Sequence, residues 1–531
     1  MKRYGMLALG LAGALLLTQC KEKEASGPKG GGLAEPVFPQ DPFPSGYGWL
    51  TIDTTLLQSD QGKEARTHGY DIFAGLMSAS GESHFPWLWQ TWNTATQAYA
   101  MPGSTADYPS SGTKSQELNF VSAQARLKGT LDATIAPLGS QVVKPNPIFV
   151  SPENACQELG ESAGCTVPAN GLRLQDNGDV LIAGVIYNEP AYNHIRNNHL
   201  YNFDSVTKNF TSTARTTIPV FPDSAIVLKP MLWPVSAKQV TPLPIFPADC
   251  YYGDCAQLKR TAGYLGPENT LLWDEAVAIH PPGLDVATES GTVPVKYLFG
   301  VEGPYPTQTY DSARLVALDK FFYFQVDSAT WASFNDVDRA IIQQSAYWIY
   351  GKPFEVGDYL ALVAMHVMTR EISGTDQGIL DWTFQSFWWD YTQDRFKGQN
   401  GKSFNEGQSE IATKHGLSDG PFDYYVQTST YGMGDPKTWP IAYNVYIELA
   451  AAHPIQTNCR SCHMRGGMPH TNVQAQALGL DTLNPVNLAQ YVNSLEPSSL
   501  ARFKTWSDTV FSGQVTTDFQ WAIPDRVNPQ E

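Results

Sequence analysis

The pattern of apolar and polar residues predicts short strands through most of the chain between about residues 47 and 400. The clearest segments are rich in β-branched and aromatic residues and are bounded by Gly, Pro, Asp or Asn, which is typical of strands. They read DVLIAGVIYN (179–188), SAIVLKPMLWPV (224–235), VKYLFGVEG (295–303) and DYLALVAMHVMTRE (358–371).

Helical periodicity appears in three other segments. They are NEPAYNHIRNNHLYNF (188–203), NDVDRAIIQQSAYWIY (335–350) and DPKTWPIAYNVYIELAAAHP (435–454). No internal repeat is visible. The chain is therefore expected to be of the mixed α+β class, with a strand-rich body over residues 47–400 and a helical C-terminal region over 401–531.

The first residues have the layout of a secretory signal peptide. They read MKRYGMLALGLAGALLLTQC, in which Lys2 and Arg3 precede an apolar run from Met6 to Leu17. That run is too short to cross a bilayer as a helix. Residues 1–19 are therefore predicted to be a signal peptide.

Cys20 is the expected lipidation site. The LTQC sequence that ends at Cys20 resembles the lipobox of bacterial lipoproteins, although Gln19 stands where Gly, Ala or Ser is usual. The alternative is a secretory signal in which Cys20 has no role. Residues 20–46 are charged and then rich in Gly and Pro, as in a flexible tether. The predicted location is the cell envelope, anchored through this lipid only, and Lys21 favours the outer membrane.

Composition and charge exclude some partners. The chain is 42% hydrophobic and 16% charged, with a formal net charge of −17, which indicates a folded globular protein. An acidic surface argues against nucleic acid and anionic lipid head groups as partners. It fits a positively charged redox partner protein, and it also fits simple solubility.

The motif that carries chemistry lies near the C-terminus, in NCRSCHMRGG (458–467). Cys459 and Cys462 have the spacing that lets two thiols form thioethers to one haem, and His463 follows as the iron ligand. A zinc site would need a second cysteine pair nearby, and none is present. One covalent haem c is therefore expected, with His463 as its proximal ligand.

The cysteine count agrees with this assignment. Seven cysteines are present, and lipid and haem use three of them. The other four form two close pairs, Cys156 with Cys165 and Cys250 with Cys255. Because an exported protein meets an oxidising compartment, each pair is predicted to form a short-loop disulfide.

No methionine or histidine that follows the signature is well placed to be the ligand on the other side of the iron. Met464 is adjacent to His463 and cannot cross the ring. Met468 lies five residues on, and an extended chain of that length reaches only about 17 Å. His470 follows in the same loop. A protein ligand is therefore expected from upstream of the signature.

His366 is the main upstream candidate. Read as a strand, residues 360, 362, 364, 366 and 368 share one apolar face, and residues 361, 363, 365 and 367 share the other. An apolar wall with one nitrogen ligand is what a haem pocket requires, but His366 is also readable as an ordinary core histidine. Met365, Met368, Met468 and an open site remain alternatives.

Several segments resemble a family of large, exported bacterial monohaem cytochrome c proteins. They are FPWLWQTWNTATQAY, NEPAYNHIRNNHLYNFD, SAIVLKPMLWPV, LVAMHVMTRE, WTFQSFWWDY and YNVYIELAAAHPIQTNCRSCH. The resemblance implies a histidine in the apolar strand, here His366, then a Trp-containing stretch, then the haem signature. FQSFWWDY departs from the family, which has acidic and His residues after the Phe. The resemblance implies an architecture and no particular reaction.

Two functions are compatible with these features. The first is an electron carrier in which iron is held on both sides. The second is a haem enzyme of the peroxidase or oxygenase type, with an open distal site and His366, Arg370 or Arg395 acting on the bound oxidant. The apolar surroundings of His366 favour the carrier, while the large size of the chain favours the enzyme.

Overall fold

The computed structural model describes the main strands of the body and isolated parts of the C-terminal region. The described residues are 62–81, 85–102, 172–176, 182–214, 216–243, 276–286, 291–299, 308–334, 336–350, 352–371, 382–391, 405–430, 444, 446, 459, 463, 466–468, 513, 515–520 and 522–523. The expected signal peptide, Cys20, the tether and most of the segment 435–454 lie outside them.

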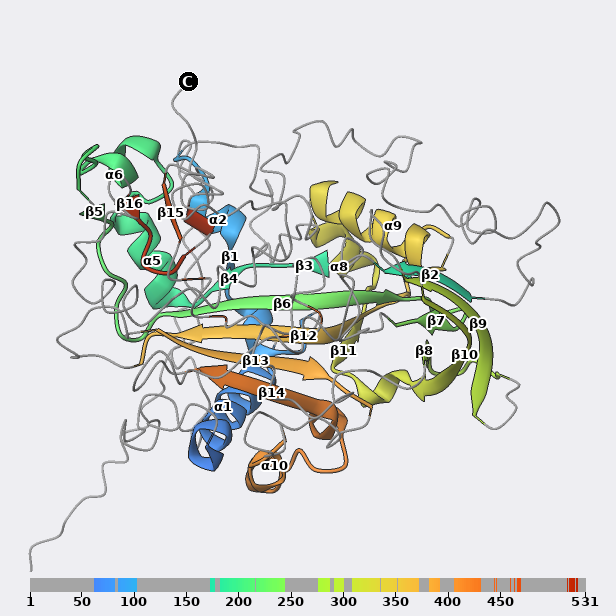
Figure 1. Cartoon of the computed structure of the whole chain (residues 1–531). Helices are drawn as coiled ribbons and strands as arrows, with labels where there is room; N and C mark the ends of the chain where they lie inside the picture. The colour runs from blue at the N-terminus through green and yellow to red at the C-terminus, as the bar shows by residue number, and fades with distance from the viewer. Residues whose placement is uncertain are drawn as a thin grey trace, which may run out of the picture.

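An eight-stranded antiparallel sheet forms the centre of the molecule (Figure 1). Its main path runs β1 (Asn93–Thr94), β4 (Ile186–Tyr187), β6 (Ile226–Val235), β12 (Tyr359–Thr369), β13 (Thr383–Trp389) and β14 (Tyr425–Thr430), while β3 (Ile182–Ala183) joins β6 and β11 (Tyr323–Gln325) joins β12. All but the first residue of β12 are buried. Burial on both faces explains why this strand is mostly apolar and does not alternate regularly with polar residues.

Two smaller sheets lie beside the central sheet. A mixed sheet has the order β2 (Leu172–Asp176), β9 (Thr292–Phe299), β10 (Gln308–Ala317), β8 (Ala276–His280) and β7 (Thr241–Pro242). A short sheet joins β15 (Gly467–Met468), β16 (Val515–Thr516) and β5 (Thr216–Thr217). The short sheet therefore ties the chain just after the haem signature to the body.

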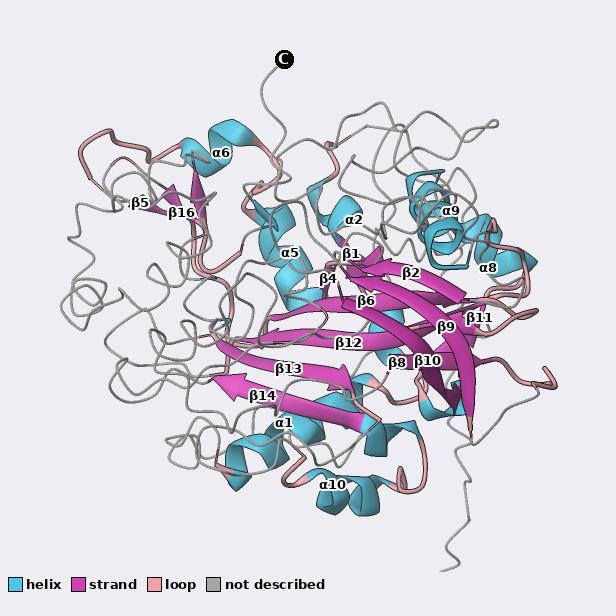
Figure 2. Ribbon diagram, turned by 45° about the vertical axis from the view of Figure 1, so that its right-hand side comes forward, coloured by secondary structure: helices cyan, strands magenta, loops and turns pink. Residues whose placement is uncertain are grey.

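The helices pack around these sheets. They are α1 (Lys63–Leu76), α2 (Ala95–Tyr99), α5 (Glu189–Asn197), α6 (Phe203–Thr207), α8 (Ser328–Ser333), α9 (Asp336–Tyr350) and α10 (Gln408–His415), with 3-10 turns η2 (Leu88–Thr91), η3 (Leu318–Lys320) and η4 (Pro421–Tyr424). Figure 2 shows α1 and α10 beside β14, and α2 and α5 beside the β4–β6 end of the sheet. α5 begins where its sequence predicts, because the Asn188 side chain accepts a bond from the Ala191 amide.

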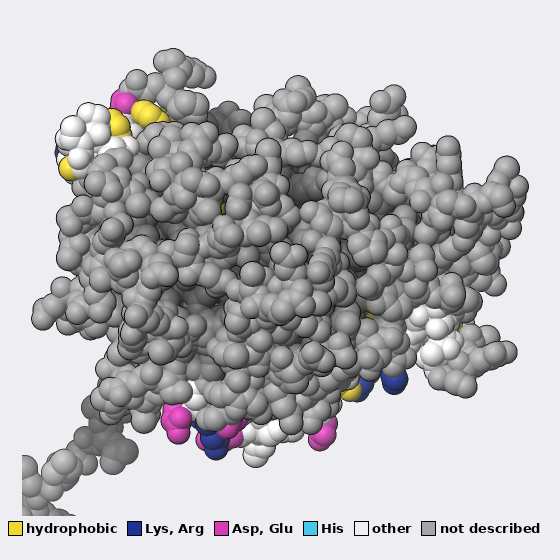
Figure 3. Space-filling model, in the orientation of Figure 1, with side chains coloured by type: hydrophobic (Ala, Val, Ile, Leu, Met, Phe, Trp, Pro, Cys, Tyr) yellow, Lys and Arg dark blue, Asp and Glu magenta, His cyan; other side chains and the backbone are white. Residues whose placement is uncertain are grey.

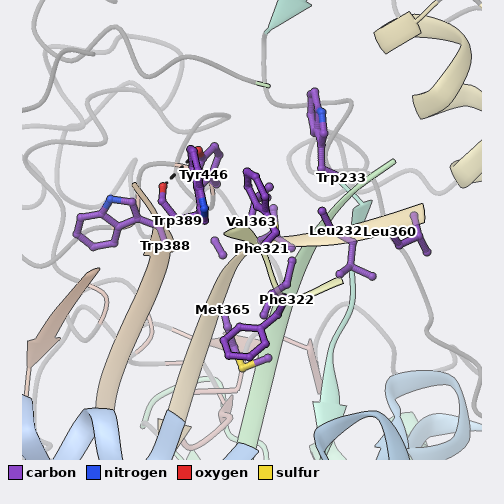
Figure 4. Close-up of a cluster of buried hydrophobic side chains, with 14 of the residues drawn as sticks. Leu232, Trp233, Phe321, Phe322, Leu360, Val363, Met365, Trp388, Trp389 and Tyr446 are labelled. Atoms are coloured by element: carbon purple, nitrogen blue, oxygen red, sulfur yellow. Dashed lines mark hydrogen bonds between the residues drawn. The ribbon is translucent and has the colours of Figure 1, made fainter. Parts of the chain in front are cut away.

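The two faces of β12 and β13 carry different residues. One face, here called the α1 face, carries Met365 opposite Phe387, and the Phe387 ring stacks on Phe73 of α1 at 4.3 Å. The other face, here called the His463 face, carries His366 opposite Ser386. Figure 4 shows Met365 beside Phe322, and Tyr446 with its hydroxyl bonded to the Trp389 carbonyl.

Several predictions from the sequence are confirmed. The mixed helix-and-strand class is correct, the segments 224–235 and 358–371 contain β6 and β12, and the segment 295–303 overlaps the end of β9. The helices expected at 188–203 and 335–350 are α5 and α9. The segment 179–188 contains two short strands, β3 and β4, where one strand was expected.

A helical C-terminal haem region is not shown. The elements delimited in the described part of residues 401–531 are the helix α10, the 3-10 turn η4 and the strands β14, β15 and β16, and Cys459, His463 and residues 522–523 are also helical. β14 pairs with β13 along its whole length. The central sheet therefore runs across the expected boundary at residue 400, because β14 completes the sheet that β12 and β13 begin.

The two predicted disulfides are not supported. Among the described residues there is no disulfide, and the one described cysteine, Cys459, is buried. Cys156, Cys165, Cys250 and Cys255 lie outside the described residues.

The described surface mixes both signs of charge. Figure 3 shows acidic and basic side chains together at the edge where Figure 1 places α10. Lys63 and Glu410 form an exposed ion pair at 3.0 Å. Such exposed pairs contribute little to stability.

Candidate haem site

The structure brings His366 and His463 together although they lie far apart in the sequence. Their ring centroids are 5.4 Å apart and their planes differ by 28°. His366 is 3% exposed, and it projects from the His463 face of β12. Neutral imidazole is the commonest metal ligand in proteins, so two neighbouring buried histidines are candidate ligands of one metal ion.

His463 is oriented by a backbone carbonyl. Its Nδ1 lies 2.9 Å from the Phe519 carbonyl oxygen. A carbonyl can only accept, so Nδ1 carries the proton and donates it. The lone pair of the ring is then on Nε2, which is the nitrogen that an iron atom would take.

His366 is held by a hydroxyl. Its Nδ1 is 3.2 Å from Ser386 Oγ, and Asn444 Nδ2 donates to the same oxygen at 3.0 Å. Asn444 Nδ2 also donates to the Phe387 carbonyl at 2.8 Å, which fixes the amide. A hydroxyl oxygen has two lone pairs, so it can accept from both Asn444 and His366. In that state the proton of His366 is on Nδ1.

The other ring nitrogen of His366 has no partner in the structure. His366 Nε2 is buried and makes no hydrogen bond. Buried polar atoms normally find a partner, and one without a partner requires an explanation. A metal ion that binds Nε2 would supply that partner.

Burial also sets the protonation of His366. Removal from water lowers the pKa of the imidazole well below its usual value, and the charges of His463 and Lys229 lower it further. Lys229 lies directly opposite His366 on β6. His366 is therefore neutral at physiological pH, which is the form that binds metals.

Apolar side chains surround the pair. The Phe384 ring lies 5.6 Å from His366 and 5.2 Å from His463, and it also contacts Phe519 at 6.2 Å. Cys459, at 5% exposure, belongs to the same buried cluster. One cysteine of the signature is therefore packed in the apolar cluster that contacts both imidazoles.

The methionine candidates occupy different places. Met368 is in the same cluster as Cys459, two residues from His366 on the His463 face. Met365 is in the core on the α1 face, opposite Phe387. Met468 lies in β15, paired with Val515. Cys462, Met464 and His470 lie outside the described residues, and so does Arg395.

A second buried histidine lies on the α1 face. His68 Nε2 is 2.6 Å from Glu371 Oε2, and the two side chains are 5% and 0% exposed. Thr369 and Thr383 donate to Glu371 Oε1 at 2.8 and 2.7 Å, and Gln385 donates to it at 3.2 Å. Burial raises the pKa of Glu371, but the His68 charge and these bonds outweigh it and hold the pKa below its ordinary value.

The residues present fit a covalent haem. His366, whose buried Nε2 makes no hydrogen bond, lies next to the oriented ring of His463, and a signature cysteine belongs to the same apolar cluster. Among the described residues, no group of three or more His, Cys, Asp or Glu side chains lies close enough together to hold a metal ion.

Sequence reasoning missed the groups that bond the two imidazoles. Ser386 stands out as a polar residue in an aromatic strand, but only the pairing of β12 with β13 places it opposite His366. Phe519 acts through its backbone carbonyl, for which no side-chain signal exists. Asn444 lies in a segment read as a helix.

Comparison with known proteins adds no further assignment. No protein-family model, curated protein or solved structure matches the chain. The family resemblance of the sequence therefore stays a prediction. Within the described residues, no helix has the length and apolar character needed to span a membrane.

Proposed function

We propose that the protein is an exported monohaem c-type cytochrome, anchored in the cell envelope by lipid at Cys20, that transfers electrons to or from a redox partner protein. Cys459 and Cys462 would hold the haem, His463 would be its proximal ligand and His366 its opposite ligand. The observation that carries this proposal is the pair of facing imidazoles, one of them with a buried nitrogen that nothing bonds.

The residues around the site support transfer of electrons more than chemistry on a substrate. When bound, haem supplies a one-electron couple whose potential depends on its axial ligands, hydrogen bonding and burial. The Phe519 carbonyl increases the basicity of His463. Ser386 holds the His366 ring, and the Phe384 ring packs against both imidazoles.

A haem enzyme with an open distal site is the alternative, and one observation favours it. Lys229 lies opposite His366 on the neighbouring strand, so a cationic side chain lies close to the distal position. In that reading His366 would be a proton donor or acceptor and not a ligand.

A spectroscopic experiment separates the two readings. We expect the ferric wild type to be low-spin, and His366→Ala to be high-spin with fast cyanide binding. His280→Ala, which changes a half-buried histidine on β8, is the matched control and should remain low-spin. A high-spin wild type would defeat the carrier proposal and favour the enzyme.

Attachment of haem and lipid is tested separately. Acid-acetone extraction should leave the haem with the polypeptide, and Cys459→Ser with Cys462→Ser should release it. Mass spectrometry of the mature N-terminus should show an acylated Cys20. A mature chain that begins elsewhere would remove the lipid anchor from the proposal without affecting the haem.

A further inference from the structure

The turn Thr517–Gln520 has an unusual backbone. Asp518 and Phe519 are consecutive and both have left-handed dihedrals, with φ of 46° and 66°. Residues other than glycine rarely adopt this region, and a bulky aromatic residue does so only where its surroundings enforce it. Strained backbone of this kind is concentrated at functional sites.

The strained residue is the one that orients the proximal histidine. The carbonyl of Phe519 accepts the bond from His463 Nδ1 at 2.9 Å. Thr517 holds the turn closed, because its hydroxyl donates to the Gln520 carbonyl at 2.8 Å and its amide donates to the Gly466 carbonyl at 2.9 Å. A Cβ on Gly466 would come within 2.9 Å of Thr517 Oγ1, so the glycine permits this close approach.

Asp518 connects the turn to the strand that carries His366. Its Oδ2 accepts from the Phe221 amide at 3.0 Å and lies 4.0 Å from Arg370 Nε. Arg370 directly follows β12, and its amide donates to the Ala225 carbonyl at 3.0 Å. The Asp518 and Arg370 side chains are each 8% exposed, so their attraction is only weakly screened by solvent.

We propose that Asp518 and Arg370 are positioning residues that hold the 517–520 turn against the end of β12, and so fix the His463 ring relative to His366. The proposal rests on the proposed haem function. A continuous series of contacts links the two ligands through protein: His366, its strand, Arg370, Asp518, Phe519 and His463. The strain at Phe519 is maintained because Asp518 is held from two sides.

A second carboxylate provides a matched control. Asp223 Oδ1 bonds Arg370 Nη1 at 2.5 Å, and its side chain is 58% exposed. Asp223→Asn removes one negative charge and a shorter contact with the same arginine, but leaves the turn unchanged. Asp518→Asn removes the charge and keeps a residue that tolerates left-handed dihedrals. Asp518→Ala removes both the charge and that tolerance.

The experiment compares full-length, haem-loaded wild type with the three variants. In Asp518→Asn we expect shifted and broadened ferric g-values in paramagnetic resonance, because the His463 ring is less fixed. We also expect a higher reduction potential, because a weaker bond to the Phe519 carbonyl makes His463 a poorer donor. Asp518→Ala should show both changes more strongly, and Asp223→Asn should match wild type.

Three results would overturn the proposal. One is wild-type g-values and potential in both Asp518 variants. Another is an equal shift of the g-values and the potential in Asp223→Asn, which would show that the loss of one negative charge is enough to cause the effect. The third is loss of folded far-UV dichroism in Asp518→Asn, which would make the turn a general stability element. A wild type without covalent haem would overturn the proposed function itself, and it is seen before any variant is compared.

Discussion

His68 and His366 are both buried against β12 or its end, on opposite sides of the central sheet, and they differ in what their ring nitrogens bond. On the α1 face, His68 is paired with Glu371 at 2.6 Å, and that carboxylate accepts further bonds from neighbouring side chains. On the His463 face, His366 bonds a hydroxyl through Nδ1 and leaves Nε2 without a partner. The His68–Glu371 pair is a structural interaction, whereas His366 has the features of a ligand site.

The comparison shows how a buried histidine can be classified from its surroundings. A structural histidine has its polar atoms satisfied by the protein, as buried polar groups generally do. A histidine that serves a cofactor keeps one nitrogen for it and uses the other to fix the ring. If the two faces are separate in this way, substitutions on the α1 face should change stability and leave the haem unchanged, whereas substitutions on the His463 face should change the haem.

The largest expected effect is on the α1 face. Glu371→Ala should lower the free energy of unfolding by about 3–5 kcal/mol, because it leaves His68 buried without its partner. Urea denaturation of the haem-loaded protein measures this loss, and the ferric spectrum should stay that of wild type. The double variant His68→Leu with Glu371→Leu should recover part of the stability. A change of spin state in Glu371→Ala would contradict the separation of the faces.

The next effect is on the reduction potential. His366→Met should keep the iron six-coordinate and raise the potential, because a Met/His pair has a higher potential than two histidines. The matched variant His68→Met, on the α1 face, should leave the potential unchanged while it destabilises the fold. Redox titration of both proteins decides this. Equal potentials in wild type and His366→Met would mean that His366 is not a ligand.

A smaller effect is expected from the hydroxyl that holds His366. Ser386→Ala removes the bond to His366 Nδ1 and should cost about 1 kcal/mol of stability. It should also speed the binding of cyanide to the ferric protein, because the His366 ring is less fixed. Stopped-flow absorption measures that rate, with Ser429→Ala on β14 of the α1 face as control. Identical rates in Ser386→Ala and wild type would remove Ser386 from the site.

The acid dependence of stability should arise mainly on the α1 face. The folded-state pKa of Glu371 lies below its ordinary value. The contribution of the ionised Glu371 to the free energy of unfolding is therefore fully present above the unfolded-state pKa of about 4.3. The contribution is lost as the pH falls through the lowered folded-state pKa. Denaturation between about pH 6 and pH 3 should show a shallower decline in Glu371→Gln than in wild type. Parallel curves would contradict this assignment.

The smallest effects separate the two methionines of β12. Met365→Leu and Met368→Leu are close in volume to wild type, and each should cost less than about 1.5 kcal/mol. Only Met368→Leu should move the haem absorption bands, because Met368 shares a cluster with Cys459 and Met365 packs on the α1 face. A conversion to high spin in Met368→Leu would show that Met368, and not His366, is the ligand.

The sequence by itself determined the local features of this protein. Composition and periodicity located β6, β9, β12, α5 and α9, because each is encoded by a run of neighbouring residues. The spacing of Cys459, Cys462 and His463 predicted a haem, and the alternation along residues 360–368 placed His366 on one apolar face and Met365 on the other.

Only the tertiary structure decided which of these residues meet. Pairing of β12 with β13 placed Ser386 opposite His366, and β14 carried the central sheet past residue 400. The acceptor that orients His463 is a backbone carbonyl in a strained turn, and Asp518 meets Arg370 only through that turn. Local patterns cannot specify such contacts, because every residue carries a carbonyl and because strand register and turn position are set by packing between distant segments.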